Sequence, residues 1–311
     1  MADRHWTWDD ALRGVLPPMI SPLRPDGEAD GAAVGRVVRF ILDGGCAGLF
    51  VLGGVGEGAW LSARQRAGIV RATVEATAGR APVLVGLMLP GTAPARDEAL
   101  RAADLGADAL VVGAPYYFGA DGPSQRRHVE AILRATPLPL LLYNIPQCTH
   151  APLARETVSA LAAEPRILGV KDSWGDLPYL QSLLDLKQTR PTFRVLQGHE
   201  HAALASLRLG ADGLIPGHAN IAPRLFVDLV HAARVDDVAT CQRLHARIVD
   251  LTRLVAPAFG LAGIYAAAAR LGLADNRPAE PWQALGGADL ETIDAILAAH
   301  DLLPVAAGAA A

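Results

Sequence analysis

The chain has few cysteines and no long apolar run, and each shortage excludes a class of protein. Its three cysteines, Cys46, Cys148 and Cys241, lie far apart and are odd in number, which fits a reducing compartment better than a disulfide framework. They also lack the paired spacing of a zinc site. No uninterrupted apolar stretch approaches the roughly 18 residues that a membrane-spanning helix needs. We therefore expect a soluble protein without a membrane partner.

Charge and the first residues narrow the class further. The formal net charge is -4, and no basic stripe with interleaved aromatic residues is present, so we expect no nucleic-acid partner. Residues 1–10 mix charges with Trp6 and Trp8 and contain no continuous apolar segment before a small-residue cleavage site, which argues against a secretory signal. We expect a cytoplasmic protein whose partner is a small molecule.

Short runs rich in Val, Leu and Ile alternate with helical stretches along the first two thirds of the chain. This alternation is typical of parallel strands that are linked by helices. Eight such runs begin near Val15, Gly48, Val83, Ala109, Leu138, Ile167, Arg194 and Gly213. Eight strand-helix units predict a (β/α)8 TIM barrel of the α/β class, with a doubly wound open sheet as the competing architecture.

The segments between the runs predict helices, and the strand pattern stops before the chain does. Residues 62–78, 92–105, 124–135 and 154–163 carry apolar residues at helical spacing. Gly106 and Gly210 are expected to end helices in the left-handed conformation. Beyond Pro223, residues 234–299 predict about three helices. We therefore divide the chain into a catalytic barrel, residues 1–233, and a C-terminal helical domain, residues 234–311, whose Ala-rich end from Val305 to Ala311 is expected to fray and to have no function.

Lys171 closes the apolar run of residues 167–170, where a buried strand should end. The chain has 28 lysine and arginine residues, of which only Lys171 and Lys187 are lysine. A nucleophilic amine near neutral pH needs its pKa lowered from about 10.4 to roughly 7, and desolvation at an apolar strand end can supply that shift. Lys171 is thus a candidate Schiff-base lysine. A surface lysine beside Asp172 is the alternative.

Two further strand ends carry groups that suit the same chemistry, because the carboxyl ends of barrel strands line the active site. Tyr143 places a phenol where a proton must move during imine formation, although a packing tyrosine is equally consistent with the sequence. The glycine-rich turn of residues 53–57 leads toward the helix near Ser62. Its backbone N–H groups are candidates for binding a carboxylate or phosphate, and a tight connection is the alternative.

In combination, these motifs resemble the dihydrodipicolinate synthase / N-acetylneuraminate lyase family of class I aldolases. The likeness covers nearly the whole chain and includes Gly-x-x-Gly-Glu at residues 53–57, Pro-Tyr-Tyr at 115–117, Tyr-Asn-x-Pro at 143–146, Gly-x-Lys-Asp at 169–172, and Gly-Leu-Ile at 213–215 followed by Asn220. The resemblance implies a barrel with C-terminal helices, usually in a homotetramer, with a homodimer as the smaller assembly. It also implies that neither a metal nor an organic cofactor is needed.

The same resemblance assigns roles to individual residues. Lys171 would form the imine with pyruvate or another 2-oxo acid, and Tyr143 would shuttle protons. Backbone N–H groups of Gly54 and Val55 would grip the substrate carboxylate. By the same likeness, Tyr117 looks like the family tyrosine that reaches a neighbouring subunit's proton relay, and the backbone of Ile215 would border the 2-oxo acid.

The chain departs from the synthases of this family at two places. The family commonly has hydroxyl side chains where this chain has Gly54 and Val55. Cys148 stands where the synthases carry an arginine for the carboxylate of the aldehyde substrate, and a thiol cannot form a bidentate pair with a carboxylate. We therefore expect a Schiff-base lyase that uses pyruvate in aldol cleavage or condensation, or dehydrates a 2-oxo-3-deoxy sugar acid, with weak or absent turnover of aspartate semialdehyde.

The end of the seventh run leaves other readings open. His199 and Glu200 are candidates for binding substrate hydroxyls, as acidic residues do in the sugar-acid lyases of this family, although Glu200 also suits a helix start. An alternative is a metal centre for hydrolysis or class II aldol chemistry, with ligands from His199, Glu200, His201 and His218. A catalytically silent member of the family that only binds its ligand is a third possibility.

Overall fold

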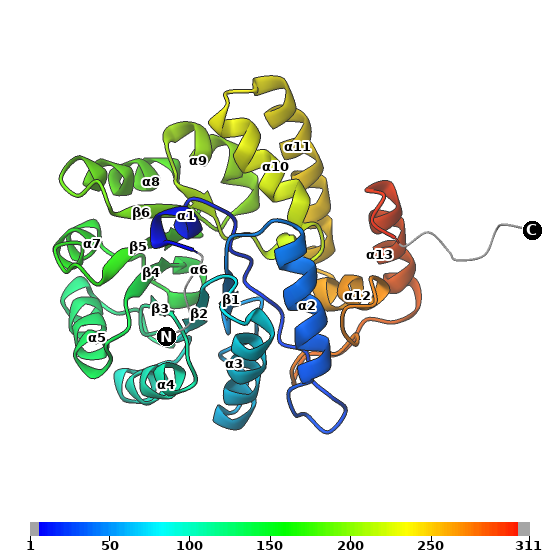
Figure 1. Cartoon of the computed structure of the whole chain (residues 1–311), viewed down its shortest axis with the longest axis horizontal. Helices are drawn as coiled ribbons and strands as arrows, with labels where there is room; N and C mark the ends of the chain where they lie inside the picture. Colours follow the sequence, from blue (N-terminus) through cyan, green and yellow to red (C-terminus); the bar gives the residue numbers. More distant parts are fainter. Residues whose placement is uncertain (1–5, 304–311) are drawn as a thin grey trace, which may run out of the picture.

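A parallel sheet of seven strands forms the centre of the computed structural model, which describes residues 6–303 (Figure 1). The strands lie in the sheet in chain order, and every neighbouring pair is parallel. They are β1 (Leu49–Val51), β2 (Val83–Gly86), β3 (Ala109–Gly113), β4 (Leu140–Asn144), β5 (Ile167–Asp172), β6 (Arg194–Gln197) and β7 (Gly213–Leu214). The predicted α/β class is confirmed, whereas the predicted tail from Val305 lies outside the described residues.

The strand predicted near Val15 is not a regular strand. Val15 and Pro18 form isolated parallel bridges, the first with β7 and the second with β1. Pro17 and Pro18 have no backbone N–H, so this segment cannot form a continuous ladder. It still hydrogen-bonds to both edges of the sheet, because the N–H of Leu16 donates to Leu214 and the N–H of Phe50 donates to Pro17. The sheet therefore curls until its two edges meet at residues 15–18.

Helices follow the strands and form a ring around them, in agreement with the predicted segments (Figure 1). The ring and its short connecting helices comprise α1 (Trp8–Leu12), α2 (Gly31–Asp43), α3 (Ala63–Thr77), α4 (Thr92–Asp104), α5 (Gly122–Ala135), α6 (Pro146–Thr149), α7 (Arg155–Leu161), α8 (Leu177–Leu184), η1 (Asp185–Gln188), η2 (Glu200–Ala202), α9 (Ala203–Leu209), η3 (Gly217–Asn220) and α10 (Pro223–Arg234). None of the helices within residues 6–303 is long and apolar enough to cross a membrane.

The chain from residue 238 onward forms a helical appendage beside the ring. It consists of α11 (Val238–Leu251), η4 (Thr252–Val255), α12 (Ala262–Arg270) and α13 (Gly287–Ala299). These three α-helices agree with the number expected for residues 234–299. The exact division of the chain into residues 1–233 and 234–311 stays a prediction, and both of its outer ends lie outside the described residues.

Local sequence explains where several helices begin and end. The Ser62 side chain accepts a hydrogen bond from the backbone of Gln65, whose side chain caps Ser62 in return, so α3 starts with a capping box. Gly106 and Gly210 have φ of 88° and 108°. Only glycine adopts this left-handed conformation without strain, which confirms the helix ends predicted at these two positions.

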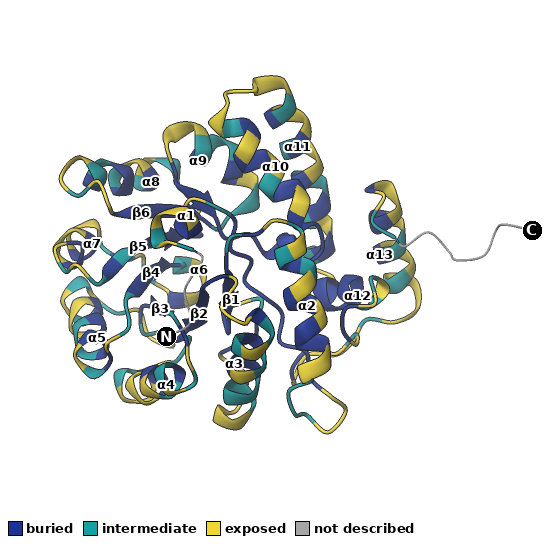
Figure 2. Cartoon of the chain, in the orientation of Figure 1, coloured by how far each residue is buried: buried dark blue, intermediate teal, exposed yellow. Residues whose placement is uncertain are grey.

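The curled sheet has two apolar faces, which appear as buried strands in Figure 2. The outer face packs against the helices through residues such as Val85, Val112 and Val170. The smaller inner face encloses Phe50, Leu84, Val111, Leu141, Tyr143, Leu196 and Ile215, with Leu12 and Leu16 packed against them. Side chains that alternate along a strand point to opposite faces, so the strands carry apolar residues on both. The inner face directly supports the site described next.

Candidate active site

Lys171 and Tyr143 are neighbours on adjacent strands, at the carboxyl edge of the sheet. Lys171 on β5 is the register partner of Tyr143 on β4. The Lys171 Nζ atom lies 4.2 Å from the centroid of the Tyr143 ring and 5.0 Å from the centroid of the Phe50 ring. The two predicted groups, an amine and a phenol, therefore share one environment.

The Lys171 amine is shielded from water. Only 3% of the residue is exposed. Burial lowers the pKa of Lys171 from 10.5 to about 7, because a charged ammonium is poorly solvated there, while the nearby Glu200 and Cys148 act in the opposite direction. A large fraction of the amine is thus uncharged at neutral pH, which agrees with the shift that Schiff-base chemistry requires.

Tyr143 is held by contacts that the sequence analysis did not include. The residue is 4% exposed, and its ring packs edge-on against Phe50 at a centroid distance of 6.2 Å. The Ser173 side chain hydrogen-bonds to Tyr143, whereas burial raises the tyrosine pKa above its usual value. The phenol is therefore neutral and oriented. Ser173 follows Lys171 by two residues, so strand alternation would have placed both side chains on one face.

Hydrogen bonds from Ser21 and Ala279 hold the glycine-rich turn in place. The Ser21 hydroxyl donates to the Gly56 carbonyl oxygen at 2.6 Å. Glu57 is fully buried, has φ of 56°, and accepts a hydrogen bond from the backbone N–H of Ala279 in the appendage at 2.8 Å. Burial raises the pKa of Glu57. The last residue of the motif thus anchors the turn, while Gly54 is exposed at its tip.

A cavity of about 380 Å³ opens beside these groups, over the carboxyl ends of β1 to β4. We call this half of the sheet mouth the open side. Its lining includes the predicted site residues Gly54, Tyr143 and Cys148. The complete lining is Gly53, Gly54, Ala59, Trp60, Leu87, Met88, Gly113, Ala114, Tyr116, Tyr143, Ile145, Cys148 and Thr149. The sequence analysis missed Trp60 and Met88, and it included Tyr116 only as part of the Pro-Tyr-Tyr motif, without a role of its own.

The half of the mouth over β6 and β7 contains several close contacts between residues of the chain, and we call it the closed side. A side chain at Gly198 would place its Cβ only 2.2 Å from the Ser173 Oγ and 2.6 Å from the Lys171 Cε. The Glu200 Oε1 accepts hydrogen bonds from the Gly217 N–H at 2.7 Å and from the His218 Nδ1 at 3.0 Å. These contacts leave little room beside Lys171 in this half, although Gly198, His199 and Glu200 are themselves only half-buried.

Glu200 and His199 lie on the closed side and do not line the cavity. The hydrogen bond and charge of His218 hold the pKa of Glu200 at about 2, although burial acts to raise it. His199 is half-buried, and its Nδ1 has no hydrogen-bond partner among the described residues. Binding of substrate hydroxyls by these two side chains stays a prediction. The observed hydrogen bonds of Glu200 join it to Gly217 and His218, and its charge raises the pKa of Lys171.

The remaining predicted residues occupy different surroundings. Ile215 is fully buried in the inner face, where its N–H donates to the Gln197 carbonyl oxygen at 2.8 Å. Val55 is half-buried and faces Gly217. Tyr117 is 76% exposed with φ of 78°, and its ring lies 5.0 Å from that of Phe118. Tyr117 does not line the cavity, so its predicted role in a neighbouring subunit is not tested by one chain.

The alternative metal centre has no matching ligand set. Within residues 6–303, no group of three or more His, Cys, Asp or Glu side chains is arranged to share an ion. Of the four candidate residues, Glu200 and His218 bind one another, and the His201 Nε2 lies 3.3 Å from the Thr252 hydroxyl. The arrangement does not favour this alternative.

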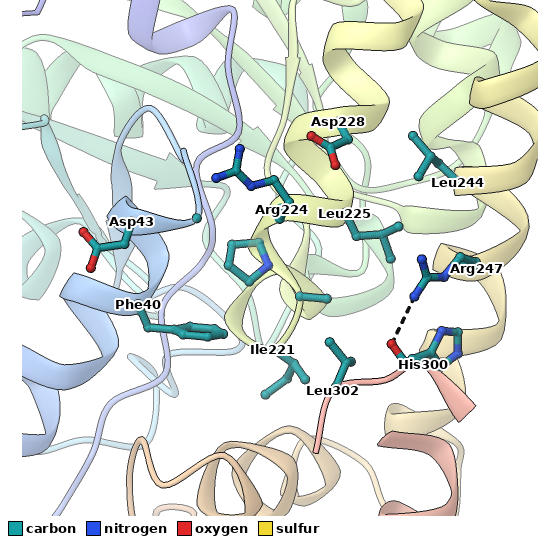
Figure 3. A pocket seen from close by; sticks show the side chains of 13 residues that line it. Phe40, Asp43, Ile221, Arg224, Leu225, Asp228, Leu244, Arg247, His300 and Leu302 are labelled. Atoms are coloured by element: carbon teal, nitrogen blue, oxygen red, sulfur yellow. Dashed lines mark hydrogen bonds between the residues drawn. The ribbon is translucent and has the colours of Figure 1, made fainter. Parts of the chain in front are cut away.

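A second hollow lies away from the strand ends (Figure 3). It measures about 520 Å³ and is bounded by α2, α10, α11 and residues 300–302. Its lining includes Phe40, Leu225 and Arg247, and the Arg247 side chain donates to the His300 carbonyl oxygen at 3.0 Å. None of the predicted site residues lines it. We therefore place the chemistry at the open side of the sheet mouth.

Comparisons with known proteins match most of the chain. The model of the dihydrodipicolinate synthetase family matches residues 11–300. A probable 2-dehydro-3-deoxy-D-pentonate aldolase, YjhH of Escherichia coli, is 35% identical over 78% of this chain and 81% of its own length. A 4-hydroxy-tetrahydrodipicolinate synthase of Salinibacter ruber is 36% identical over 79% and 81%. The crystal structure of YagE, a prophage protein of the dihydrodipicolinic acid synthase family from Escherichia coli in complex with pyruvate, superimposes with a TM-score of 0.88 at 28% identity, covering 93% of this chain and 98% of that one.

Proposed function

Because the chain belongs to the dihydrodipicolinate synthetase family and is a lyase that acts on a 2-oxo acid through a Schiff base, we propose Lys171 as the imine-forming residue. The observation that carries this proposal is the buried Lys171 amine, which lies 4.2 Å from the Tyr143 ring centroid beside a cavity. The retention of both groups in one site disfavours a catalytically silent binding protein.

The proposed reaction begins with attack of the uncharged amine on the ketone carbon of pyruvate. Water leaves, and the resulting cationic imine withdraws electrons from the adjacent carbon. Loss of a proton from that carbon, or cleavage of its bond to the next carbon, then gives an enamine. Tyr143 would relay the protons, because its hydroxyl is neutral and Ser173 orients it.

The substrate carboxylate would lie at the glycine-rich turn. Gly54 is exposed at the cavity lining, and no atom lies within 4 Å of the position that a Cβ on it would take. Backbone N–H groups of Gly54 and Val55 would donate to the carboxylate, and the backbone of Ile215 would border the 2-oxo acid. We include Tyr117 as a relay residue only in an assembly, as a homotetramer or homodimer.

The cavity supports an aldolase more strongly than a dihydrodipicolinate synthase. Cys148 lines it at the place where a synthase would use a guanidinium group, and the turn offers no hydroxyl. The natural substrate would therefore be a 4-hydroxy-2-oxo acid, the class to which 2-oxo-3-deoxy sugar acids belong. The relative from Escherichia coli that is named a 2-dehydro-3-deoxy-D-pentonate aldolase carries the same class in its name.

We further propose that the curled sheet is a closed (β/α)8 TIM barrel in which residues 15–18 take the eighth strand position. Hydrogen bonds from this segment to both β1 and β7 support closure. The likeness to the YagE structure supports the same architecture. The cytoplasmic location and the lack of a cofactor stay predictions.

Turnover assays test the proposed reaction. Purified protein is incubated with a panel of 4-hydroxy-2-oxo acids, and released pyruvate is followed with lactate dehydrogenase and NADH. We expect pyruvate release from at least one member of the panel, and condensation of pyruvate with aspartate semialdehyde at a far lower kcat/KM. Ordinary synthase efficiency with aspartate semialdehyde would contradict the aldolase assignment.

A further inference from the structure

Among residues 6–303, none of those that line the cavity on the open side has a charged side chain. Apart from the glycines, its lining consists of apolar residues, three aromatic residues, Cys148 and Thr149. A carboxylate or phosphate on the far end of a substrate would therefore find no cation in this wall. An unpaired charge in such surroundings is strongly unfavourable. Apart from the carboxylate proposed to lie at the glycine-rich turn, the part of the substrate that lies here must therefore be uncharged.

The few hydroxyl groups in the wall already have hydrogen-bond acceptors. The Thr149 Oγ1 lies 2.8 Å from the Ala151 carbonyl oxygen and 3.1 Å from that of Ile145. The Tyr116 hydroxyl lies 3.4 Å from the Met88 carbonyl oxygen. Each hydroxyl has one proton to donate, so these contacts use it. A polyhydroxylated chain would lose its hydrogen bonds to water here and find few free donors in return, although the two hydroxyl oxygens can still accept.

Exposed aromatic surface continues from the cavity to its rim. Trp60 lines the cavity and is 42% exposed. Trp282, from the segment between α12 and α13, is 51% exposed and meets the Trp60 ring edge-on at a centroid distance of 5.7 Å. Exposed tryptophan rings beside a cavity suit the binding of an apolar ligand group. Trp282 would hold Trp60 in position.

Resting on the proposed aldolase function, we propose that the aldehyde half of the substrate is uncharged and apolar, with an alkyl or aryl group rather than a polyol chain. The 4-hydroxy-2-oxo acid then breaks between C3 and C4. The C4 hydroxyl loses its proton and becomes the aldehyde, while C3 retains the bonding electrons as the enamine and later gains a proton. Hydrolysis of the imine releases pyruvate, so the reaction needs no oxidant or reductant.

A matched pair of aldehydes tests this inference in the condensation direction. Propanal and D-glyceraldehyde have the same three carbons and differ only by two hydroxyl groups. Each is supplied with pyruvate to the full-length protein, and product formation is measured by chromatography. Benzaldehyde adds an aryl group, and succinic semialdehyde adds a carboxylate. We expect kcat/KM for propanal or benzaldehyde to exceed that for the other two by about tenfold or more.

Two variants connect the preference to the wall. Trp60→Ala should lower the ratio of kcat/KM for benzaldehyde over D-glyceraldehyde by about tenfold, because it removes the largest apolar group of the wall. Leu209→Ala, a change at a residue 43% exposed on α9 and outside the cavity, should leave the ratio unchanged. If Trp60→Ala does not fold, the wild-type comparison still decides the question.

The outcomes separate the inference from the proposed function. If borohydride traps pyruvate on Lys171 but D-glyceraldehyde or succinic semialdehyde reacts as well as propanal, the inference is wrong and the aldolase assignment stands. The same holds if pyruvate is trapped and none of the aldehydes reacts. If pyruvate is not trapped at all, the proposed function fails, and the inference fails with it.

Discussion

The open and closed sides of the sheet mouth are built from equivalent strand ends but differ in what occupies them. Over β1 to β4, glycines and apolar side chains leave a cavity of about 380 Å³. Over β6 and β7, Glu200 binds Gly217 and His218, and Gly198 lies against Ser173 and Lys171. A polar side chain at a strand end is therefore not by itself evidence of substrate binding. Lys171 on β5 lies between the two sides.

Among the variants considered, removal of the Lys171 side chain should have the largest effect on activity. Lys171→Ala should lower kcat/KM by roughly 10⁴-fold or more, as the loss of a covalent nucleophile does. The chain supplies its own control, because Lys187 is the only other lysine and pairs with Asp212 at 2.9 Å, away from the cavity. Lys187→Ala should retain activity in the pyruvate-release assay. Equal losses in both variants would contradict the role of Lys171.

Matched glycine substitutions test whether the closed side is tightly filled. Gly198→Ala would place a methyl group 2.6 Å from the Lys171 Cε, and the resulting displacement of the amine should lower kcat by roughly 10²-fold. Gly54→Ala meets no atom within 4 Å and keeps the backbone N–H, so its loss should be much smaller. Steady-state kinetics of the two variants would show the reverse order if the open side were the filled one.

Glu200 tests the structural role of the closed side. Glu200→Ala leaves the N–H groups of Gly217 and His218 without their acceptor, which should lower the free energy of unfolding by about 2 kcal/mol. Glu200→Gln keeps an acceptor oxygen and should cost less. Urea unfolding measures both. An alanine variant as stable as the wild type would show that these hydrogen bonds do not support the fold.

Glu200 on the closed side should influence activity through its effect on the pKa of Lys171. Its pKa of about 7 means that the amine is mostly protonated below pH 7, so the rate of imine formation with pyruvate should fall about tenfold per pH unit there and level off above. Because Glu200 raises the pKa of Lys171, Glu200→Gln should move this limb to lower pH. A pH profile of borohydride trapping measures the shift. The same pH dependence in Glu200→Gln and in the wild type would show that Glu200 does not influence the pKa of Lys171.

Much of the fold could be predicted from the sequence, because seven apolar runs form strands in the predicted order. The run near Val15 differs, since Pro17 and Pro18 remove the amide donors of a ladder. The pairing of Lys171 with Tyr143 followed from their motifs and from the convergence of strand ends. Ser173 was not predicted, but it could have been, because strand alternation places it on the same face as Lys171.

The division into an open and a closed side could not be predicted. It depends on contacts between residues far apart in the chain, such as the 18-residue separation between Glu200 and His218. It also depends on the close approach of Gly198 to Ser173, which no local pattern encodes. The anchoring of Glu57 by Ala279 joins the turn to the appendage across 222 residues. Such distances explain why motif residues were found while their surroundings were not.

The central claim is that the Lys171 amine condenses with a 2-oxo acid, and borohydride trapping with pyruvate tests it most directly. The reduced protein is digested at arginine, and the peptides are analysed by mass spectrometry. Lys171 and Lys187 lie on the same peptide, because no arginine stands between them, so fragmentation of that peptide locates the adduct. We predict a reduced pyruvate adduct on Lys171 and an unmodified Lys187. An unmodified Lys171 under conditions in which the wild-type protein releases pyruvate from a 4-hydroxy-2-oxo acid would contradict the claim.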